Sequence, residues 1–177
     1  MLNKSETIER KEEIVKAIKA GSIFIYPTDT IYGMGCNSTN KEAVQKIREI
    51  KKRERNPMSV IAPNKEWIKQ NLSSSDDSKL DLLPGPFTLI LNMKNVEIVA
   101  QNVSYMKTLG ARIPKNWFSE IIAEALLPFI TTSVNFSSEK NMERIEDVPK
   151  ELLEQVDYVI YEGAIVGKQS TRIDLTK

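Results

Sequence analysis

The chain has 177 residues, 41% of them hydrophobic, which is close to the size of one domain and sufficient for a hydrophobic core. Its net charge is only +1 at pH 7, so any attraction for anions must come from local clusters of cations. It contains no histidine and one cysteine, Cys36, which excludes histidine bases, Ser-His triads, histidine-ligated metals and an intramolecular disulfide.

The first part of the chain predicts one helix followed by a buried strand. Apolar residues recur at helical spacing over residues 5–20, and Gly21 is typical of a helix end. Residues 22–26 are rich in β-forming residues and predict a buried strand, which Pro27 ends.

A short polar segment follows this strand. Thr28, Asp29 and Thr30 supply two hydroxyls and a carboxylate, and Gly33 and Gly35 permit tight turns and close approach of the backbone to a ligand. An open α/β sheet places its ligand at the end of a buried strand. We therefore expect this segment to form part of a binding site.

A basic segment lies at the end of the next predicted helix. Residues 39–42 have the form of a capping box, and the apolar stripe that follows ends near Ile50. Lys51 and Arg53 come next and would point to one side if the backbone were extended there. Two such cations can hold a polyphosphate, whereas the alternative is that the cations of residues 46–55 only complement the helix dipole.

The remaining apolar stretches alternate irregularly between strand and helix patterns, which favours a mixed sheet over a purely parallel one. Predicted strands cover residues 58–62, 88–93, 109–114, 129–134, 158–161 and 171–175, and predicted helices cover a short segment at 67–68 and residues 117–127 and 148–156.

Several polar residues in these strands are candidates for a site, each with a plainer alternative. Arg112 lies inside a predicted strand and would matter only beside an anion, since strand arginines more often pair with a carboxylate. Ser133 and Asn135 share one face of a strand end, or form a simple turn. Asp29 and Asp174 have no partners at metal-site spacing, so we expect no metal site built from protein ligands.

Seven short motifs, in order along nearly the whole chain, resemble those of the YrdC-like family, the threonylcarbamoyl-AMP synthases also called TsaC. They are residues 27–33 (Pro-Thr-Asp-Thr-Ile-Tyr-Gly), 51–53 (Lys-Lys-Arg), 56–58 (Asn-Pro-Met), 84–88 (Pro-Gly-Pro-Phe-Thr), 112–114 (Arg-Ile-Pro), 133–135 (Ser-Val-Asn) and 170–174 (Ser-Thr-Arg-Ile-Asp).

The resemblance implies an α/β fold, with an open, twisted mixed sheet and flanking helices around a positively lined cavity, and a single domain over residues 1–177. It implies synthesis of threonylcarbamoyl-adenylate and pyrophosphate from ATP, L-threonine and bicarbonate, with Mg²⁺ bound through the phosphates. That product serves a tRNA modification completed by partner proteins. The single cysteine fits a cytoplasmic protein, and no apolar run reaches the length of a membrane span, so we expect no membrane attachment. The few cations expected at the site would allow only weak tRNA binding.

The resemblance also implies roles for residues at matching positions. The expected ATP-binding residues are Lys51, Arg53, Asn56, Arg112, Ser133 and Asn135, with Lys51 and Arg53 also catalytic. The expected threonine-binding residues are Thr30, Thr108, Thr131 and Ser170.

Three positions depart from the family pattern, and two other functions stay open. Ile61 stands where some members have a histidine, Ser138 where a glycine is usual, and Arg172 where a hydrophobic residue is usual. A paralogous adenylating enzyme with another substrate is one alternative. A non-catalytic RNA-binding module is the other, although duplex binding needs many phosphate contacts and the net charge is near zero.

Overall fold

The computed structural model describes residues 1–53, 55–134 and 142–177. Within these residues the strands are β1 (Leu2–Asn3), β2 (Phe24–Tyr26), β3 (Gly33–Gly35), β4 (Ser59–Ile61), β5 (Leu72–Ser73), β6 (Phe87–Met93), β7 (Thr108–Arg112), β8 (Phe129–Ser133), β9 (Tyr158–Tyr161) and β10 (Thr171–Asp174). The α-helices are α1 (Lys4–Glu9), α2 (Lys11–Ala20), α3 (Lys41–Ile50), α4 (Lys65–Asn71), α5 (Trp117–Glu124) and α6 (Lys150–Leu153).

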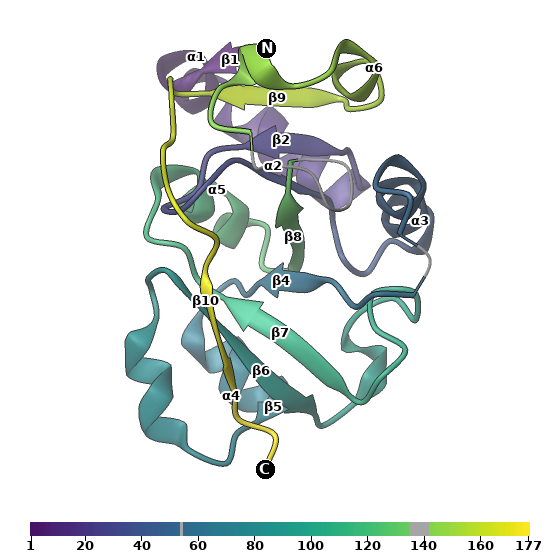
Figure 1. Ribbon diagram of the computed structural model, residues 1–177, viewed down its shortest axis with the longest axis vertical. Coiled ribbons are helices and arrows are strands. Elements are labelled where there is room, and N and C mark those ends of the chain that lie inside the picture. Colours follow the sequence, from purple (N-terminus) through teal and green to yellow (C-terminus); the bar gives the residue numbers. More distant parts are fainter. Residues whose placement is uncertain (54, 135–141) are drawn as a thin grey trace.

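The strands form one mixed sheet that twists along its length (Figure 1). Their order is β1-β9-β2-β3-β8-β4-β7-β6-β10, and β5 pairs separately with β6. The pairs β1–β9, β9–β2, β4–β7 and β6–β10 are parallel, whereas the other pairs are antiparallel. The expected open, twisted mixed sheet with flanking helices is therefore confirmed.

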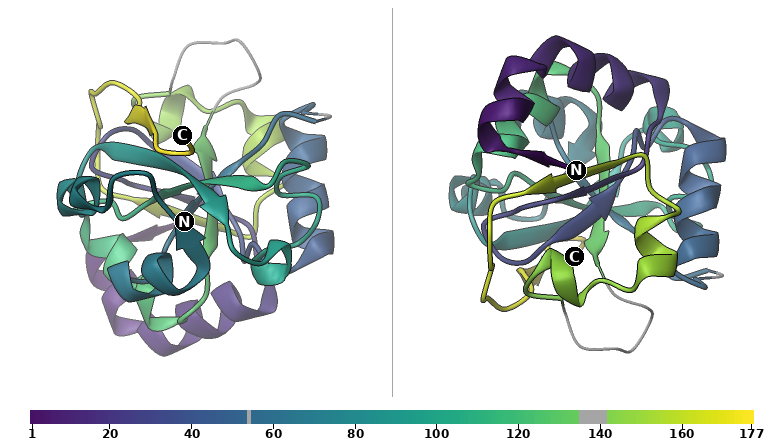
Figure 2. Two further views of the ribbon diagram at one scale, coloured as in Figure 1. Left: turned by 90° about the horizontal axis from the view of Figure 1, so that it is seen from below. Right: turned by 90° about the horizontal axis from the view of Figure 1, so that it is seen from above.

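Helices cover both faces of the upper half of this sheet, and the alternation of side chains in β2 shows why. Phe24 and Tyr26 point into one apolar cluster, which contains Ile14 of α2 and Phe118 of α5. Ile25, between them, points into the other cluster, together with residues of α3 and α6. A strand buried on both faces needs an unbroken apolar run, which is what this strand has. Figure 2 shows α2 and α6 on opposite sides of the sheet.

Two helix starts differ from the sequence prediction. The helix expected over residues 5–20 is two helices, because the backbone of Arg10 leaves the helical region and caps both. Ile8, one of the apolar residues within that predicted helix, is exposed. The N-cap of α3 is Asn40 rather than Thr39, and its side chain accepts hydrogen bonds from the amides of two residues in the first turn.

The glycines after the polar segment form a strand rather than the expected turns. β3 pairs with both β2 and β8, and three residues are too few to show an alternating pattern in the sequence. A Cβ atom on Gly35 would overlap the carbonyl oxygen of Ile130 in β8. The expected close approach of the backbone is therefore to a neighbouring strand at Gly35, whereas Gly33 lines the cavity described next.

Candidate functional site

Polar side chains surround a cavity of about 400 Å³ beside the centre of the sheet. Its walls come from the segment after β2, the end of α3, and strands β4, β6, β7, β8 and β10. Eight of the ten residues predicted for the site line it: Thr30, Lys51, Arg53, Asn56, Arg112, Thr131, Ser133 and Ser170. Four of its lining residues are cations, the fourth being Arg172, so the cavity is positively lined as expected.

Two other residues singled out from the sequence, Thr108 and Ile61, are not among the described residues that line this cavity. Thr108 begins β7 and pairs with Asn92, whereas Arg112 lies at the opposite end of the same strand. Ile61 is buried in the cluster between α2 and α5. The predicted site residue Asn135 and the variant position Ser138 lie outside the described residues.

Lys51 and Arg53 reach the cavity from a turn, not from an extended segment. Lys51 ends α3 in a helical conformation, and Lys52 has a positive φ of 49°, which turns the chain between the two cations. Lys51 Nζ donates to the Ser133 carbonyl oxygen at 2.5 Å, and Arg53 Nη1 donates to Thr132 Oγ1 at 3.5 Å. The extended backbone on which the i, i+2 argument depended is therefore not found, yet both cations contact residues of β8.

The Arg53 guanidinium has hydrogen-bonding capacity left for a ligand. Its Nε atom is buried and has no hydrogen-bond partner among the described residues. Burial lowers the pKa of Arg53 from its ordinary value, and the nearby charges of Arg172 and Arg48 lower it further. An anion in the cavity would offset the repulsion between the guanidiniums.

Arg48 fixes the loop that carries the cations. It is 3% exposed, and its guanidinium donates to four backbone carbonyl oxygens: those of Asn102 at 2.5 Å, Arg53 at 3.1 Å, Asn56 at 3.3 Å and Val103 at 3.2 Å. In the sequence, Arg48 was one of the cations for which interaction with the helix dipole was the alternative to a role in the site. The structure gives it a second role, since it positions two residues that line the cavity.

A buried ion pair adjoins the cavity through Arg112, which is one of its lining residues. Arg112 Nη2 donates to Asp29 Oδ1 at 2.5 Å, and the two side chains are 6% and 10% exposed. Asp29 Oδ2 also accepts from the amide of Lys115 at 3.0 Å. Burial lowers the pKa of Arg112, and the Asp29 carboxylate opposes that shift. Arg112 is therefore a strand arginine paired with a carboxylate, as one of its two interpretations had it, and it also lines the cavity.

The hydroxyl groups of Thr30 and Thr28 continue the hydrogen-bond network from Arg112, and their donor and acceptor roles can be assigned. Arg112 Nη1 donates to Thr30 Oγ1 at 3.3 Å, and Thr28 Oγ1 donates to the Ile31 carbonyl oxygen at 2.7 Å. Thr28 Oγ1 and Thr30 Oγ1 are also 2.9 Å apart. Because the hydroxyl hydrogen of Thr28 is already donated to Ile31, Thr30 must be the donor in this hydrogen bond and Thr28 the acceptor. Thr30 can consequently still accept one hydrogen bond from a ligand, but its own hydrogen is already in use.

The floor of the cavity consists of small and hydroxyl-bearing residues. Ser59 of β4 and Thr88 of β6 both line it, and these two strands flank β7, which contains Gly110. A Cβ atom on Gly110 would overlap Ser59 Oγ. Ser170, expected to hold a ligand, shares a hydrogen bond of 2.7 Å with Thr88 Oγ1. This bond attaches the segment before β10 to β6.

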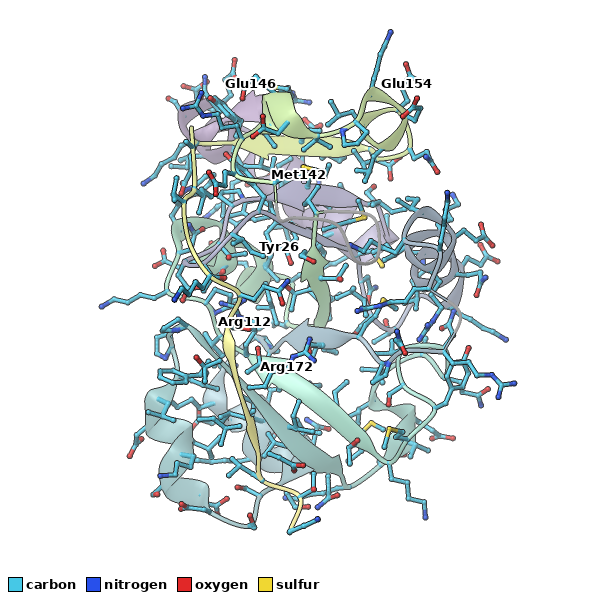
Figure 3. The ribbon with its side chains drawn as sticks, in the orientation of Figure 1. Tyr26, Arg112, Met142, Glu146, Glu154 and Arg172 are labelled. Atoms are coloured by element: carbon cyan, nitrogen blue, oxygen red, sulfur yellow. The ribbon has the colours of Figure 1, made fainter. Side chains whose placement is uncertain are left out.

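Sequence reasoning missed several lining residues, of which Arg172 is the most informative. Arg172 lies two residues after Ser170, at the start of a predicted strand, and alternate residues of a strand share a face. This spacing could have predicted that Arg172 lines the same cavity as Ser170. Figure 3 shows Arg112 and Arg172 near one another in the middle of the molecule, beside β10, and both line the cavity.

The described residues contain no cluster of three or more potential metal-ligating side chains of the His, Cys, Asp and Glu types. In the same part of the chain, no helix has the length and hydrophobicity needed to cross a membrane.

Cys36 is buried at 0% exposure, and burial raises the pKa of its thiol. Since the thiolate is the reactive form, we expect native protein at pH 8 to resist alkylation by iodoacetamide, and denatured protein to be labelled fully. Mass spectrometry of the intact chain measures both, and rapid labelling of native protein would contradict the buried placement.

A protein-family model for Sua5, YciO and YrdC proteins, described as telomere recombination, matches residues 16–177. A Methanocaldococcus jannaschii protein named as a candidate threonylcarbamoyl-AMP synthase is 37% identical, over 98% of this chain and 84% of its own length. The uncharacterized protein YciO of Escherichia coli is 29% identical, over 93% of this chain and 82% of its own length.

A similar fold occurs in the crystal structure of P. abyssi Sua5 complexed with L-threonine. The TM-score is 0.87 at 24% sequence identity, and the match covers 99% of this chain and 54% of that protein. The chain thus spans about half the length of that Sua5 protein, and the likeness at this identity concerns the fold.

Proposed function

The chain belongs to the Sua5, YciO and YrdC family, and we propose that it converts ATP, L-threonine and bicarbonate into threonylcarbamoyl-adenylate and pyrophosphate. One observation carries the proposal: a single cavity is lined both by Lys51 and Arg53 and by Arg112 with its hydrogen-bond partner Thr30. The name of the archaeal relative and the L-threonine bound to Sua5 support the same reaction.

We assign the triphosphate to the wall formed by Lys51 and Arg53. The guanidinium offers a planar set of donors, one of which is a buried Nε without a partner among the described residues, and the ammonium acts as a compact charge. Asn56, Ser133 and Arg112 line the same cavity and complete the proposed ATP site. Asn135 stays part of the proposal from the sequence pattern alone.

We assign L-threonine to the hydroxyl-rich wall of the cavity, near Thr30, Thr131 and Ser170. The free lone pair of Thr30 Oγ1 suits an ammonium or hydroxyl donor, and both groups occur on threonine. Thr108 is not retained in this assignment, because it lies at the far end of β7 from Arg112.

The proposed reaction needs orientation and charge stabilisation more than a protein base. The threonine amine and bicarbonate form a carbamate with loss of water, and a carbamate oxygen attacks the α-phosphorus. The bond from this phosphorus to the bridging oxygen breaks, and pyrophosphate leaves with the electron pair. Lys51 and Arg53 would stabilise the charge that grows on the leaving group, which suits a chain without histidine.

Mg²⁺ is part of this proposal as an ion that arrives with ATP. Asp29 is engaged by Arg112 and the amide of Lys115, and the residues that line the cavity in the described part of the chain include no carboxylate. This donor set suits a cation held by phosphate oxygens and water, as Mg²⁺ commonly is. The ion would neutralise phosphate charge there.

The wider setting is proposed from the same reaction. The adenylate would pass to partner proteins that modify tRNA, with at most weak direct binding of tRNA to this chain. The free Cys36 fits a reducing cytoplasm. The one continuous sheet supports treating residues 1–177 as a single domain.

Pyrophosphate release tests the proposal directly. We expect release only when ATP, L-threonine and bicarbonate are all present, because the carbamate cannot form without the last two. A coupled phosphate assay with each component omitted in turn measures this, and the Lys51→Met variant controls for contaminating ATPases. Equal turnover with L-serine would refute threonine specificity.

A paralogous enzyme with another amino-acid substrate is the second candidate, favoured by the 29% identity to YciO and by the extra cation Arg172 in the cavity. The same assay with a panel of amino acids distinguishes the two, since a paralogue would release pyrophosphate with an amino acid other than threonine.

A further inference from the structure

Arg172 is a cation of the cavity that the expected family pattern does not include. It lies in β10, the edge strand, and its register partner in β6 is Thr88. The next residue of β6, Leu89, pairs with Ala111, so Thr88 stands beside Arg112 of β7. Thr88 therefore has an arginine on each side of it, and all three residues line the cavity.

The three arginines that line the cavity, Arg53, Arg112 and Arg172, differ in their ion-pair partners. Arg112 is neutralised by Asp29 at 2.5 Å, whereas neither Arg172 nor Arg53 forms an ion pair with a described carboxylate. Arg172 is exposed. Burial lowers the pKa of Arg53 most, and the nearby positive charge of Arg172 lowers it further. Two guanidiniums held near one another without an acid between them favour an anion there.

We propose that Arg172 is an additional anion-binding residue of this site, and that it holds, together with Arg53, the polyphosphate end of the ligand. This inference rests on the proposed nucleotide site and deepens it. A polyphosphate fits better than a single carboxylate, because one terminal phosphate has enough oxygens to accept from two guanidiniums at once. The residue would thereby set how strongly this chain binds ATP relative to family members with an aliphatic residue here.

Calorimetric binding of inorganic tripolyphosphate tests the inference without requiring turnover. We expect Arg172→Val to weaken binding about tenfold, because the lost bond is charge-assisted but partly exposed to solvent. Arg172→Lys should retain much of the affinity, since it keeps the charge. The matched control is Lys168→Ala, which removes an exposed cation just before β10 that does not line the cavity, and should change nothing.

The outcomes separate this inference from the proposed reaction. Unchanged tripolyphosphate affinity in Arg172→Val, in a protein that still unfolds at the wild-type temperature, would overturn the inference while leaving the reaction intact. A rise in the KM for L-threonine alone would also overturn it, and would assign Arg172 to a carboxylate. If Arg172→Val binds tripolyphosphate more weakly and the wild-type protein releases no pyrophosphate with any amino acid, the inference would be supported and the proposed reaction refuted.

Discussion

Replacing Lys51 with methionine is expected to weaken ATP binding about 10- to 100-fold while leaving a folded protein. Lys51 is 2% exposed, and methionine fills a similar volume without the charge. Hydrogen bonds to charged groups contribute about 1.5–3 kcal/mol, and each 1.4 kcal/mol corresponds to about a tenfold change in affinity. Calorimetric titration with ATP gives the affinity, and thermal unfolding shows whether the fold persists.

The matched controls lie in the same turn. Arg53→Gln should weaken ATP binding by a similar factor, since it removes the second cation of that wall. Lys52→Ala also removes a positive charge, but Lys52 does not line the cavity, so ATP affinity should hardly change. Equal losses in all three variants would mean that general electrostatic attraction, and not a specific pair, binds the nucleotide.

Removing the carboxylate of Asp29 is expected to destabilise the fold strongly. Asp29→Ala would leave Arg112 buried without its partner, and breaking a buried ion pair in this way costs about 3–5 kcal/mol. The loss should lie near the lower value, because the pair opens onto a cavity that water can enter. Urea denaturation followed by circular dichroism measures the free energy of unfolding.

Two further variants make this result interpretable. Asp81→Ala removes an acid whose side chain is 90% exposed in a surface pair with Lys65, and should change the free energy of unfolding by less than about 1 kcal/mol. The double variant Asp29→Ala, Arg112→Met removes both charges and should be more stable than Asp29→Ala alone. If the double variant were the less stable one, an uncompensated charge would not be the cause.

The elements that sequence reasoning placed well are those with strong local patterns. Residues 22–26 and 129–134 were predicted as strands and contain β2 and β8, because both segments are rich in aromatic and β-branched residues that favour strands. The break at Arg10 and the strand β3 were missed, since neither a single non-helical residue nor a Gly-Met-Gly segment changes the apolar period.

The site shows the same division between local and long-range information. Ordered motifs brought Lys51, Arg53 and Arg112 together through a family resemblance, and the cavity contains all three. The Asp29–Arg112 pair joins residues 83 positions apart, so no local pattern could predict it. The turn at Lys52 was equally hidden, because a positive φ at a lysine has no signature in composition.

The placement of the last two strands bears on when the molecule becomes functional during synthesis. β9 and β10 are neighbours in sequence, yet they lie near opposite ends of the sheet, joined by residues 162–170, which Figure 1 shows running along the molecule. A nascent chain reaching only Tyr161 could form the pairs on one side, but it would lack Ser170, Arg172 and the partner that covers β6. Ribosomes deliver the N-terminal part first, so we expect nucleotide binding to appear only after β10 has been synthesised and has docked onto β6.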